Sequence, residues 1–325
     1  MELFSELSTI NEKELAIIKQ KVGVDGLENG DTNSKYLHSR LRWKRTRNEL
    51  TSLEVDGIWI DDPQILKRHV KNYMANRFVV WHGGELNLDG IQFKKITKYD
   101  KEQLFKRFIE QEMVEAVGKC GSLKSPRSNG FNFSFIKSNR VVIGIDFTKA
   151  IISFDKSGLI SRGCNASFIS LVSKKDNPSI LNDFRPISLV GCTYKVVSKI
   201  LANRLRIVLP RVIDVHQSVF LRGRRLLDSV LVANEVVDFM RKEKKSGLLV
   251  KVDFEKAYNS VHWKYLVYMM SRLDFCSKWI KWIKACLEST SISILLNDNP
   301  TEEFIPRRGL RQGDLLVPLS FFYSN

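Results

Sequence analysis

The chain has 325 residues, of which 43% are hydrophobic, including 19 Phe and 6 Trp. This much apolar material suffices for one large core or two smaller ones, and it excludes a disordered protein. An excess of basic residues, 52 Lys and Arg against 36 Asp and Glu, gives a net charge of +16 and favours nucleic acid as partner. We find no long apolar run and no targeting segment, so we expect no membrane partner and an intracellular location, in the cytoplasm or nucleus.

The cysteines and histidines do not suggest a metal or redox site. The five cysteines are far apart and form no Cys-x-x-Cys pair, which favours reduced structural thiols. The five histidines show no metal-binding spacing, which disfavours a protease or a zinc site. No small-molecule cofactor is expected.

A basic segment follows an N-terminal stretch, residues 1–34, that has the composition of a connection. Residues 35–47, KYLHSRLRWKRTR, hold six Lys or Arg, no acid and interleaved aromatic rings. Cations contact phosphates and aromatic rings stack on bases, so this segment is a candidate nucleic-acid arm. The alternative is a solvated basic helix face. The candidate binding residues are Arg40, Arg42, Trp43, Lys44, Arg45 and Arg47.

The next elements are predicted mainly from apolar spacing. A hairpin is expected over residues 49–63 and a helix over residues 63–78. Helical spacing also predicts one helix over residues 104–117, and an apolar stretch over residues 141–154 is compatible with another.

The remaining elements alternate between helices and strands. Residues 167–174 alternate as a strand does, residues 176–186 form a loop with two prolines, and a helix ends at Pro210. A further helix, Leu226 to Lys242, precedes a buried strand at residues 248–254. Two helices and a hairpin at residues 291–306 complete an α+β fold.

Asp253 ends the predicted buried strand, where a loop would expose its carboxylate at the edge of a sheet. Hard cations such as Mg²⁺ prefer oxygen ligands, and nucleotide transfer commonly uses two such ions. Taken alone, Asp253 is better explained as a helix N-cap or a surface acid.

Four sequence segments place Asp253 in a wider pattern: NDFRPISL, KILANRL, VDFEKAYNSVHW and RRGLRQGD occur in this order between residues 182 and 314. Together they resemble the LINE-type, non-LTR reverse transcriptases, especially those of plant genomes. The resemblance implies an RNA-directed DNA polymerase with an RNA template, a DNA primer and Mg²⁺. It also implies a partial right-hand fold, fingers and an incomplete palm, with a mostly helical N-terminal extension.

The resemblance assigns roles to individual positions. Asp253 matches the first metal-binding aspartate, and the carbonyl of Phe254 would lie beside the same metals. Tyr258 matches the aromatic residue that disfavours a 2′-hydroxyl. The alternative for Tyr258 is a half-buried core residue.

Five further residues complete the implied site. Arg185 matches the arginine that holds the triphosphate, with Lys174 or Lys175 as its basic neighbour. Gln312 and Gly313 match a pair that contacts the nascent base pair and template. Surface salt bridges are the alternative for the lysines, and a simple turn is the alternative for Gln312 and Gly313.

The family's Tyr/Phe-x-Asp-Asp hairpin is not found after Gln312, and capping is the simplest role for Asp314. We therefore expect a truncated polymerase that is inactive as this chain and does not bind Mg²⁺ properly. The alternatives are a nonspecific nucleic-acid-binding protein without catalysis and a chain that does not fold stably. The expected domains are a basic N-terminal linker region at 1–100, a helical extension at 101–160, and a partial reverse transcriptase domain at 161–325 that lacks the Asp-Asp hairpin and the thumb.

Overall fold

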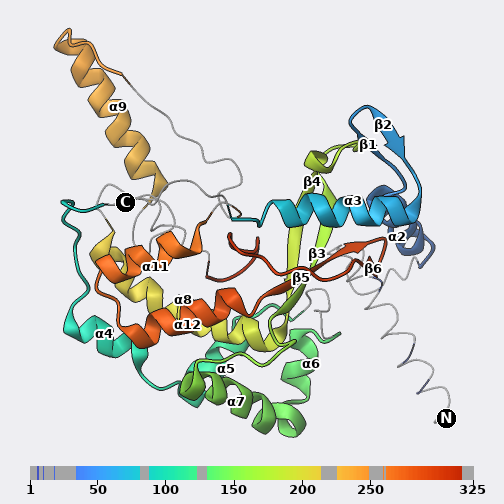
Figure 1. Ribbon diagram of the computed structural model, residues 1–325, viewed down its shortest axis with the longest axis horizontal. Helices are drawn as coiled ribbons and strands as arrows, with labels where there is room; N and C mark the ends of the chain where they lie inside the picture. The colour runs from blue at the N-terminus through green and yellow to red at the C-terminus, as the bar shows by residue number, and fades with distance from the viewer. Residues whose placement is uncertain are drawn as a thin grey trace.

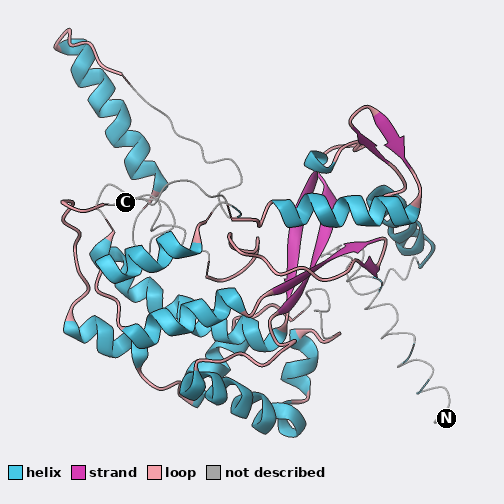
Figure 2. Ribbon diagram, viewed as in Figure 1, coloured by secondary structure: helices cyan, strands magenta, loops and turns pink. Residues whose placement is uncertain are grey.

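The computed structural model describes residues 34–80, 88–122, 130–213, 225–248, 259 and 261–316, with the single positions 6, 10 and 18. Helices and strands are mixed, and helices dominate (Figure 2), which confirms the prediction of a fold that combines both. Two layers are visible in Figure 1: a bundle of helices around α8 and a small sheet covered by α3. The predicted strand at 248–254 lies outside the described residues, apart from Leu248.

The sheet has four strands in the order β4-β3-β5-β6. Their bounds are Ala166–Ser173 for β3, Phe184–Val190 for β4, Ser291–Leu296 for β5 and Asn299–Pro300 for β6. β3 runs antiparallel to β4 and parallel to β5, while β5 and β6 form a hairpin. The predicted strand at 167–174 is therefore confirmed. The hairpin after residue 291 is also present, but its second strand lies at Asn299–Pro300, in the predicted turn, and only an isolated bridge from Phe304 to Ile292 falls in the segment predicted as that strand.

One face of this sheet is covered by α3 (Pro63–Asn76). The helix begins where Asp62 accepts hydrogen bonds from the amides of Gln64 and Ile65, with Pro63 in the first turn. The hairpin of β1 (Leu53–Val55) and β2 (Ile58–Ile60) precedes it, as predicted. The buried residues of this sheet core are Leu50, Leu53, Leu66, Val70, Met74, Phe78, Ile169, Leu171, Leu181, Phe184, Ile292, Ile294 and Leu296.

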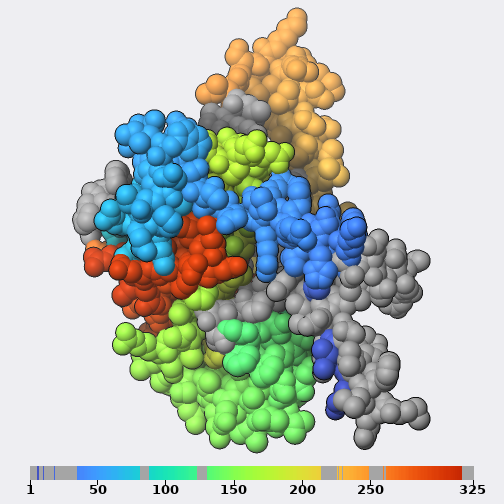
Figure 3. Space-filling view, turned by 90° about the vertical axis from the view of Figure 1, so that its right-hand side faces the viewer, coloured from blue at the N-terminus to red at the C-terminus, as the bar shows by residue number. Residues whose placement is uncertain are grey.

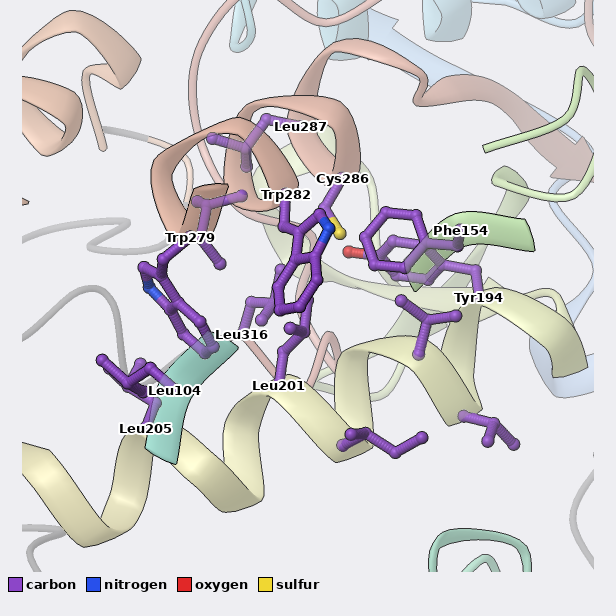
Figure 4. Close-up of a cluster of buried hydrophobic side chains, with 14 of the residues drawn as sticks. Leu104, Phe154, Tyr194, Leu201, Leu205, Trp279, Trp282, Cys286, Leu287 and Leu316 are labelled. Atoms are coloured by element: carbon purple, nitrogen blue, oxygen red, sulfur yellow. The ribbon is translucent and has the colours of Figure 1, made fainter. Parts of the chain in front are cut away.

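The helical layer is built around α8 (Cys192–Val212), whose side chains are buried along most of its length. Its neighbours are α4 (Lys98–Phe105), α5 (Glu110–Gly118), α6 (Phe133–Ser138), α7 (Arg140–Ser157), α11 (Trp263–Arg272) and α12 (Ser277–Glu288). Figure 4 shows the centre of this core, where Trp282 points from α12 toward Leu201 of α8 and lies beside Phe154. The ring centroid of Trp282 is 5.2 Å from that of Phe108 and 6.0 Å from that of Phe154.

The single helix predicted over residues 104–117 is wrong, because the chain leaves the helical conformation between α4 and α5. Lys106 has an extended ψ of 147°, and α5 starts at Glu110. The guanidinium of Arg204 on α8 binds the carbonyl oxygens of Leu104, Lys106 and Arg107 at 3.0, 2.5 and 3.1 Å. A tertiary contact thus satisfies carbonyl groups that a continuous helix would have satisfied locally.

Two other boundaries also differ from the prediction. The helix expected to end at Pro210 continues to Val212, so Pro210 lies in its last turn. The loop predicted over residues 176–186 ends at Asp183, because β4 starts at Phe184 and includes Pro186. Proline is tolerated there because β4 is an edge strand and does not need every amide for the ladder.

α9 (Leu226–Lys242) has the predicted bounds and projects from the helical layer in Figure 1. Its exposed apolar side chains are Leu227, Val230, Leu231, Val232, Val236 and Phe239. Across the described part of the chain, no helix combines the length and apolar character needed to span a membrane.

The N-terminal third contributes to both cores. Leu53 and Val70 belong to the sheet core, and Ile96 and Leu104 belong to the helical core. The segment predicted as a linker region at 1–100 therefore contains elements that share cores with residues 166–316. The domain boundaries themselves stay predictions.

Candidate functional site

A buried polar cluster fixes the turn at residues 311–314. The guanidinium of Arg311 donates to Asp314 Oδ2 at 2.9 Å, and the hydroxyl of Tyr194 on α8 donates to the same oxygen at 2.8 Å. The side chains of Arg311 and Asp314 are both 4% exposed. Asp314 Oδ1 also accepts the amide of Leu316 at 3.1 Å, which is a local turn contact of the kind expected for a capping residue.

Asn165, immediately before β3, connects this cluster to the rest of the fold. Arg311 donates to the Asn165 carbonyl at 3.1 Å and to its Oδ1 at 2.7 Å. The side-chain amide of Asn165 in turn donates from Nδ2 to the carbonyl of Cys286 at 2.8 Å and to Thr290 Oγ1 at 3.0 Å. Neither Asn165 nor Tyr194 is predicted from the sequence. The i, i+3 spacing of Arg311 and Asp314 signals only the local pair.

The charges in this cluster follow from burial and from its internal contacts. Burial raises the pKa of Tyr194 well above its usual value, with a further contribution from Asp314, so the phenol stays a donor. Burial lowers the pKa of Arg311, but Tyr194 and Asp314 outweigh it and raise the pKa overall. The cluster is thus a charged Arg–Asp pair whose carboxylate is also bound by a neutral hydroxyl.

The turn presents Gln312 and Gly313 on the surface next to β4. The Gln312 carbonyl accepts the amide of Ser188 at 3.2 Å, on the strand edge that β3 does not use. Gly313 has φ of +96°, and a Cβ atom there would lie 3.7 Å from the Ser188 carbonyl oxygen. The structure therefore brings Gln312 and Gly313 to the same strand as Arg185.

The segment before this turn packs on residues that follow Tyr258 in the chain. The Gly309 amide donates to the Val261 carbonyl at 2.7 Å, and Trp263 Nε1 donates to the Gly309 carbonyl at 2.9 Å. A Cβ atom at Gly309 would lie only 2.7 Å from the Asn259 carbonyl oxygen. Asp253, Phe254 and Tyr258 lie outside the described residues, so their side chains are not placed.

The two candidate lysines lie at the start of the loop between β3 and β4, residues 174–183. Lys174 Nζ donates to the Asn182 carbonyl at 2.6 Å, and Lys175 Nζ pairs with Asp183 Oδ2 at 3.0 Å. For Lys175 this is the surface salt bridge that the sequence left open as an alternative. The side chain of Arg185 is exposed and makes no hydrogen bond or ion pair with another residue in the described part of the chain.

Arg185 points away from α3. Along β4, exposed Arg185 and Ile187 alternate with buried Phe184 and Ser188. Arg185 is opposite Val172 in the register, on the sheet face that α3 does not cover. Its guanidinium is therefore accessible to a ligand.

The Asp183 carboxylate closes the loop. It accepts the amides of Ser179 and Ile180 at 3.1 and 3.2 Å. Burial raises the pKa of Asp183, but Lys175 and these two amides outweigh this effect, and the pKa falls below its usual value. The loop is thus held by a carboxylate that stays ionised at neutral and mildly acidic pH.

The predicted basic arm is a helix, α2 (Ser34–Asn48), with a buried Leu37 and a largely exposed surface. Trp43 is 53% exposed and lies between two guanidinium groups, with Arg40 at 5.7 Å and Arg47 at 5.1 Å from its ring centre. Arg47 also pairs with Asp176 of the 174–183 loop at 2.5 Å. The other candidates on α2, Arg42, Lys44 and Arg45, are exposed.

The arm and the loop are therefore adjacent, although Arg47 and Asp176 lie 129 positions apart in the sequence. Figure 3 shows the yellow-green loop between blue N-terminal segments. The β1 strand adds a second contact, since the Glu54 amide donates to the Ser179 carbonyl at 2.8 Å. No three His, Cys, Asp or Glu side chains come together as metal ligands within the described ranges.

Comparison with known proteins finds a family match for the C-terminal segment of the chain. Residues 172–323 match the model of reverse transcriptases (RNA-dependent DNA polymerases). The Transposon TX1 uncharacterized 149 kDa protein of Xenopus laevis is 26% identical over 295 residues, which cover 89% of this chain and 22% of that protein.

Two retrotransposon proteins also match. The Pol polyprotein from the type-2 retrotransposable element R2DM of Drosophila melanogaster is 27% identical over 43% of this chain and 13% of its own length. The Pol polyprotein from the type-1 element R2 of Popillia japonica is 26% identical over 66% of this chain and 29% of its own length. The chain thus spans less than a third of each relative. The matched reverse transcriptase segment at residues 172–323 and the similarity to these relatives together support a LINE-type reverse transcriptase of the non-LTR retrotransposons.

Proposed function

We propose that residues 161–325 supply the fingers and part of the palm of an RNA-directed DNA polymerase that extends a DNA primer along an RNA template. Residues 101–160 would be a helical extension of this core, and residues 1–100 a basic N-terminal region. A location in the cytoplasm or nucleus belongs to the same proposal, because both compartments contain RNA.

One observation carries this proposal: the Gln312–Gly313 turn binds the outer edge of β4 at Ser188, the strand that also presents Arg185. Three residues of extended strand span about 10 Å, so one nucleoside triphosphate could contact both groups. Arg185 would hold the phosphates, and the turn would contact the base pair.

The remaining roles rest on the family resemblance. Reverse transcriptases use divalent metal ions, which would be held by the Asp253 carboxylate and the Phe254 carbonyl. A bound Mg²⁺ supplies charge compensation for the phosphates. Tyr258 would exclude a 2′-hydroxyl by its bulk, and Lys174 or Lys175 would assist Arg185.

Triphosphate binding tests the assignment of Arg185. A fluorescent deoxynucleoside triphosphate with Mg²⁺ is titrated into the full chain, and Arg185→Ala is expected to weaken binding about tenfold, since a charge-assisted hydrogen bond is removed. Arg162→Ala is the matched control, because Arg162 is also exposed and has no pair among the described residues. Equal affinity in the two variants would remove Arg185 from the site.

Primer extension tests catalysis by the 325-residue polypeptide. We expect no extension on an RNA template, because Asp253 alone of the metal-binding aspartates implied by the resemblance is present in these residues. Extension that is abolished in Asp253→Ala would contradict this expectation.

A second candidate function is nucleic-acid binding without catalysis, favoured by the Arg47–Asp176 contact that joins the basic helix to the loop. Neutralising Arg40, Arg42, Lys44 and Arg45 to Gln should weaken binding of single-stranded RNA. It should also lower the salt dependence by about 0.7 for each phosphate that the protein no longer neutralises.

The control neutralises four exposed lysines outside α2 and so removes the same net charge. These lysines are Lys94, Lys98, Lys281 and Lys284. Equal loss of affinity in both variants would show that net charge alone, and not the α2 surface, attracts RNA.

A further inference from the structure

The C-terminal end of α3 contacts the loop that carries the candidate lysines. Arg77 Nη2 donates to Asn182 Oδ1 at 2.9 Å and to the Tyr73 hydroxyl at 2.6 Å. The Tyr73 hydroxyl donates to the same Asn182 oxygen at 2.6 Å, and the Arg77 guanidinium lies 4.6 Å from the Tyr73 ring centre. Two side chains at this end of α3 thus converge on one oxygen of the loop.

Asn182 transmits this contact to the loop, because its own carbonyl accepts Lys174 Nζ at 2.6 Å. The next residue, Asp183, binds Lys175 through its carboxylate and the Lys174 amide through its carbonyl, at 3.0 and 2.7 Å. A displacement of Asn182 would therefore displace both lysines.

The same end of α3 also binds the segment that leads to Gln312. Arg308 Nε donates to the Arg77 carbonyl at 3.1 Å, and the Arg307 amide donates to the Phe78 carbonyl at 3.0 Å. Phe78 is buried, with its ring centroid 6.0 Å from that of Phe304. The side chain of Arg77 thus holds one segment of the candidate site, and the backbone of Arg77 and Phe78 holds the other.

We propose that Arg77 is a positioning residue that fixes the 174–183 loop relative to the 307–314 segment, with Tyr73 as its support. The relevance of this spacing to triphosphate rests on the function proposed above. α3 is suited to the role because it is itself anchored on the sheet by Leu66, Val70 and Met74. It lies outside the 172–323 segment that matches the reverse transcriptase family.

Amide hydrogen exchange of the full chain tests whether the Arg77 side chain holds the 174–183 loop while the backbone of Arg77 and Phe78 holds the 307–314 segment. Arg77→Ala should raise exchange about tenfold across residues 174–183 and leave residues 307–309 unchanged, because the backbone acceptors remain. Arg308→Ala should give the opposite pattern. Arg68→Ala, an exposed change on the same helix, should alter neither segment.

Two further readouts separate positioning from a general loss of structure. Arg77→Lys should restore most of the protection, because an ammonium group can still donate to Asn182, and the amides within α3 should exchange as in the wild type. Unchanged exchange at 174–183 in Arg77→Ala, or raised exchange throughout α3, would overturn the proposal.

Triphosphate binding then connects Arg77 to the site. Arg77→Ala should weaken binding of the fluorescent deoxynucleoside triphosphate several-fold. If Arg185→Ala weakens binding and Arg77→Ala does not, positioning for the triphosphate is refuted. If the wild-type chain binds no triphosphate, the proposed function fails, and the exchange pattern alone decides whether Arg77 holds the loop.

Discussion

The two segments of the candidate site are held in opposite ways. The 311–314 turn is fixed by a charged pair with side chains 4% exposed, bound to α8 and to the residue before β3. The 174–183 loop buries Leu181 in the sheet core, but its charged contacts lie at the surface, including the Arg47–Asp176 pair, in which Asp176 is 83% exposed. Loss of one partner from a buried pair costs several kcal/mol, whereas surface pairs contribute about 0–1 kcal/mol.

This difference has a consequence for ligand binding. Water and salt compete with the contacts of the loop, so a polyanion could replace Asp183 at Lys175 at low energetic cost. The turn has no such freedom, because moving it would expose or unpair Arg311 and Asp314. The proposed phosphate contact at Lys175 would then be adjustable, whereas the proposed base contact at Gln312 and Gly313 would be rigid.

The largest expected effect is on the buried pair. Arg311→Met should lower the free energy of unfolding by about 3–5 kcal/mol, because Asp314 is left buried without its cation. Urea denaturation measures this. Arg307→Met is the control, since Arg307 is exposed and its described hydrogen bond uses only the backbone, so a change within about 0.5 kcal/mol is expected. A loss below about 1 kcal/mol in Arg311→Met would mean that the turn is not fixed by this pair.

The next effect tests the close packing of the turn segment. Gly309→Ala combines φ of +79° with a Cβ atom 2.7 Å from the Asn259 carbonyl oxygen. Gly163→Ala has nearly the same φ, +83°, with no atom within 4 Å. The control should cost about 1 kcal/mol for the backbone conformation alone, and Gly309→Ala clearly more. Equal thermal denaturation midpoints would contradict the packing of residue 309 on residue 259.

A smaller effect is expected at the surface. Arg47→Gln should lower stability by less than about 1 kcal/mol, and the loss should shrink as salt rises, because exposed charges are screened. Urea denaturation at low and high salt measures both. A loss independent of salt would show that Arg47 acts through packing on Trp43 and not through Asp176.

The smallest effect concerns pH. The folded-state pKa of Asp183 is lowered, so its contribution to stability is present above its ordinary pKa, near 3.8, and is lost as pH falls through the lower folded value. The stability difference between wild type and Asp183→Asn should therefore be constant near neutral pH and vanish in acid. A difference that grows with falling pH would contradict the lowered pKa.

The sequence predicted most elements whose signals are local. Apolar spacing predicted α3, the sequence also indicated helices at α7, α9, α11 and α12, and alternation predicted β3. It did not predict the break between α4 and α5, because Arg204 is distant in sequence from Leu104. It also did not predict the start of β4, because this strand includes Pro186, a residue typical of loops. It found Arg185, Gln312 and Gly313 as candidates through motifs. It missed Asn165, Tyr194 and Arg77, whose contacts span 105 to 146 residues.

By itself, therefore, the sequence determined the resemblance to reverse transcriptases, the basic character, and elements governed by neighbouring residues, such as the α3 start at Asp62 and Pro63. Only the tertiary structure decided which candidates become neighbours. The basic arm meets the loop through Arg47 and Asp176, and the Gln312 turn meets β4 through Ser188. The physical reason is that caps, turns and periodicity act within a few residues, whereas buried charges and edge strands find partners wherever the chain places them.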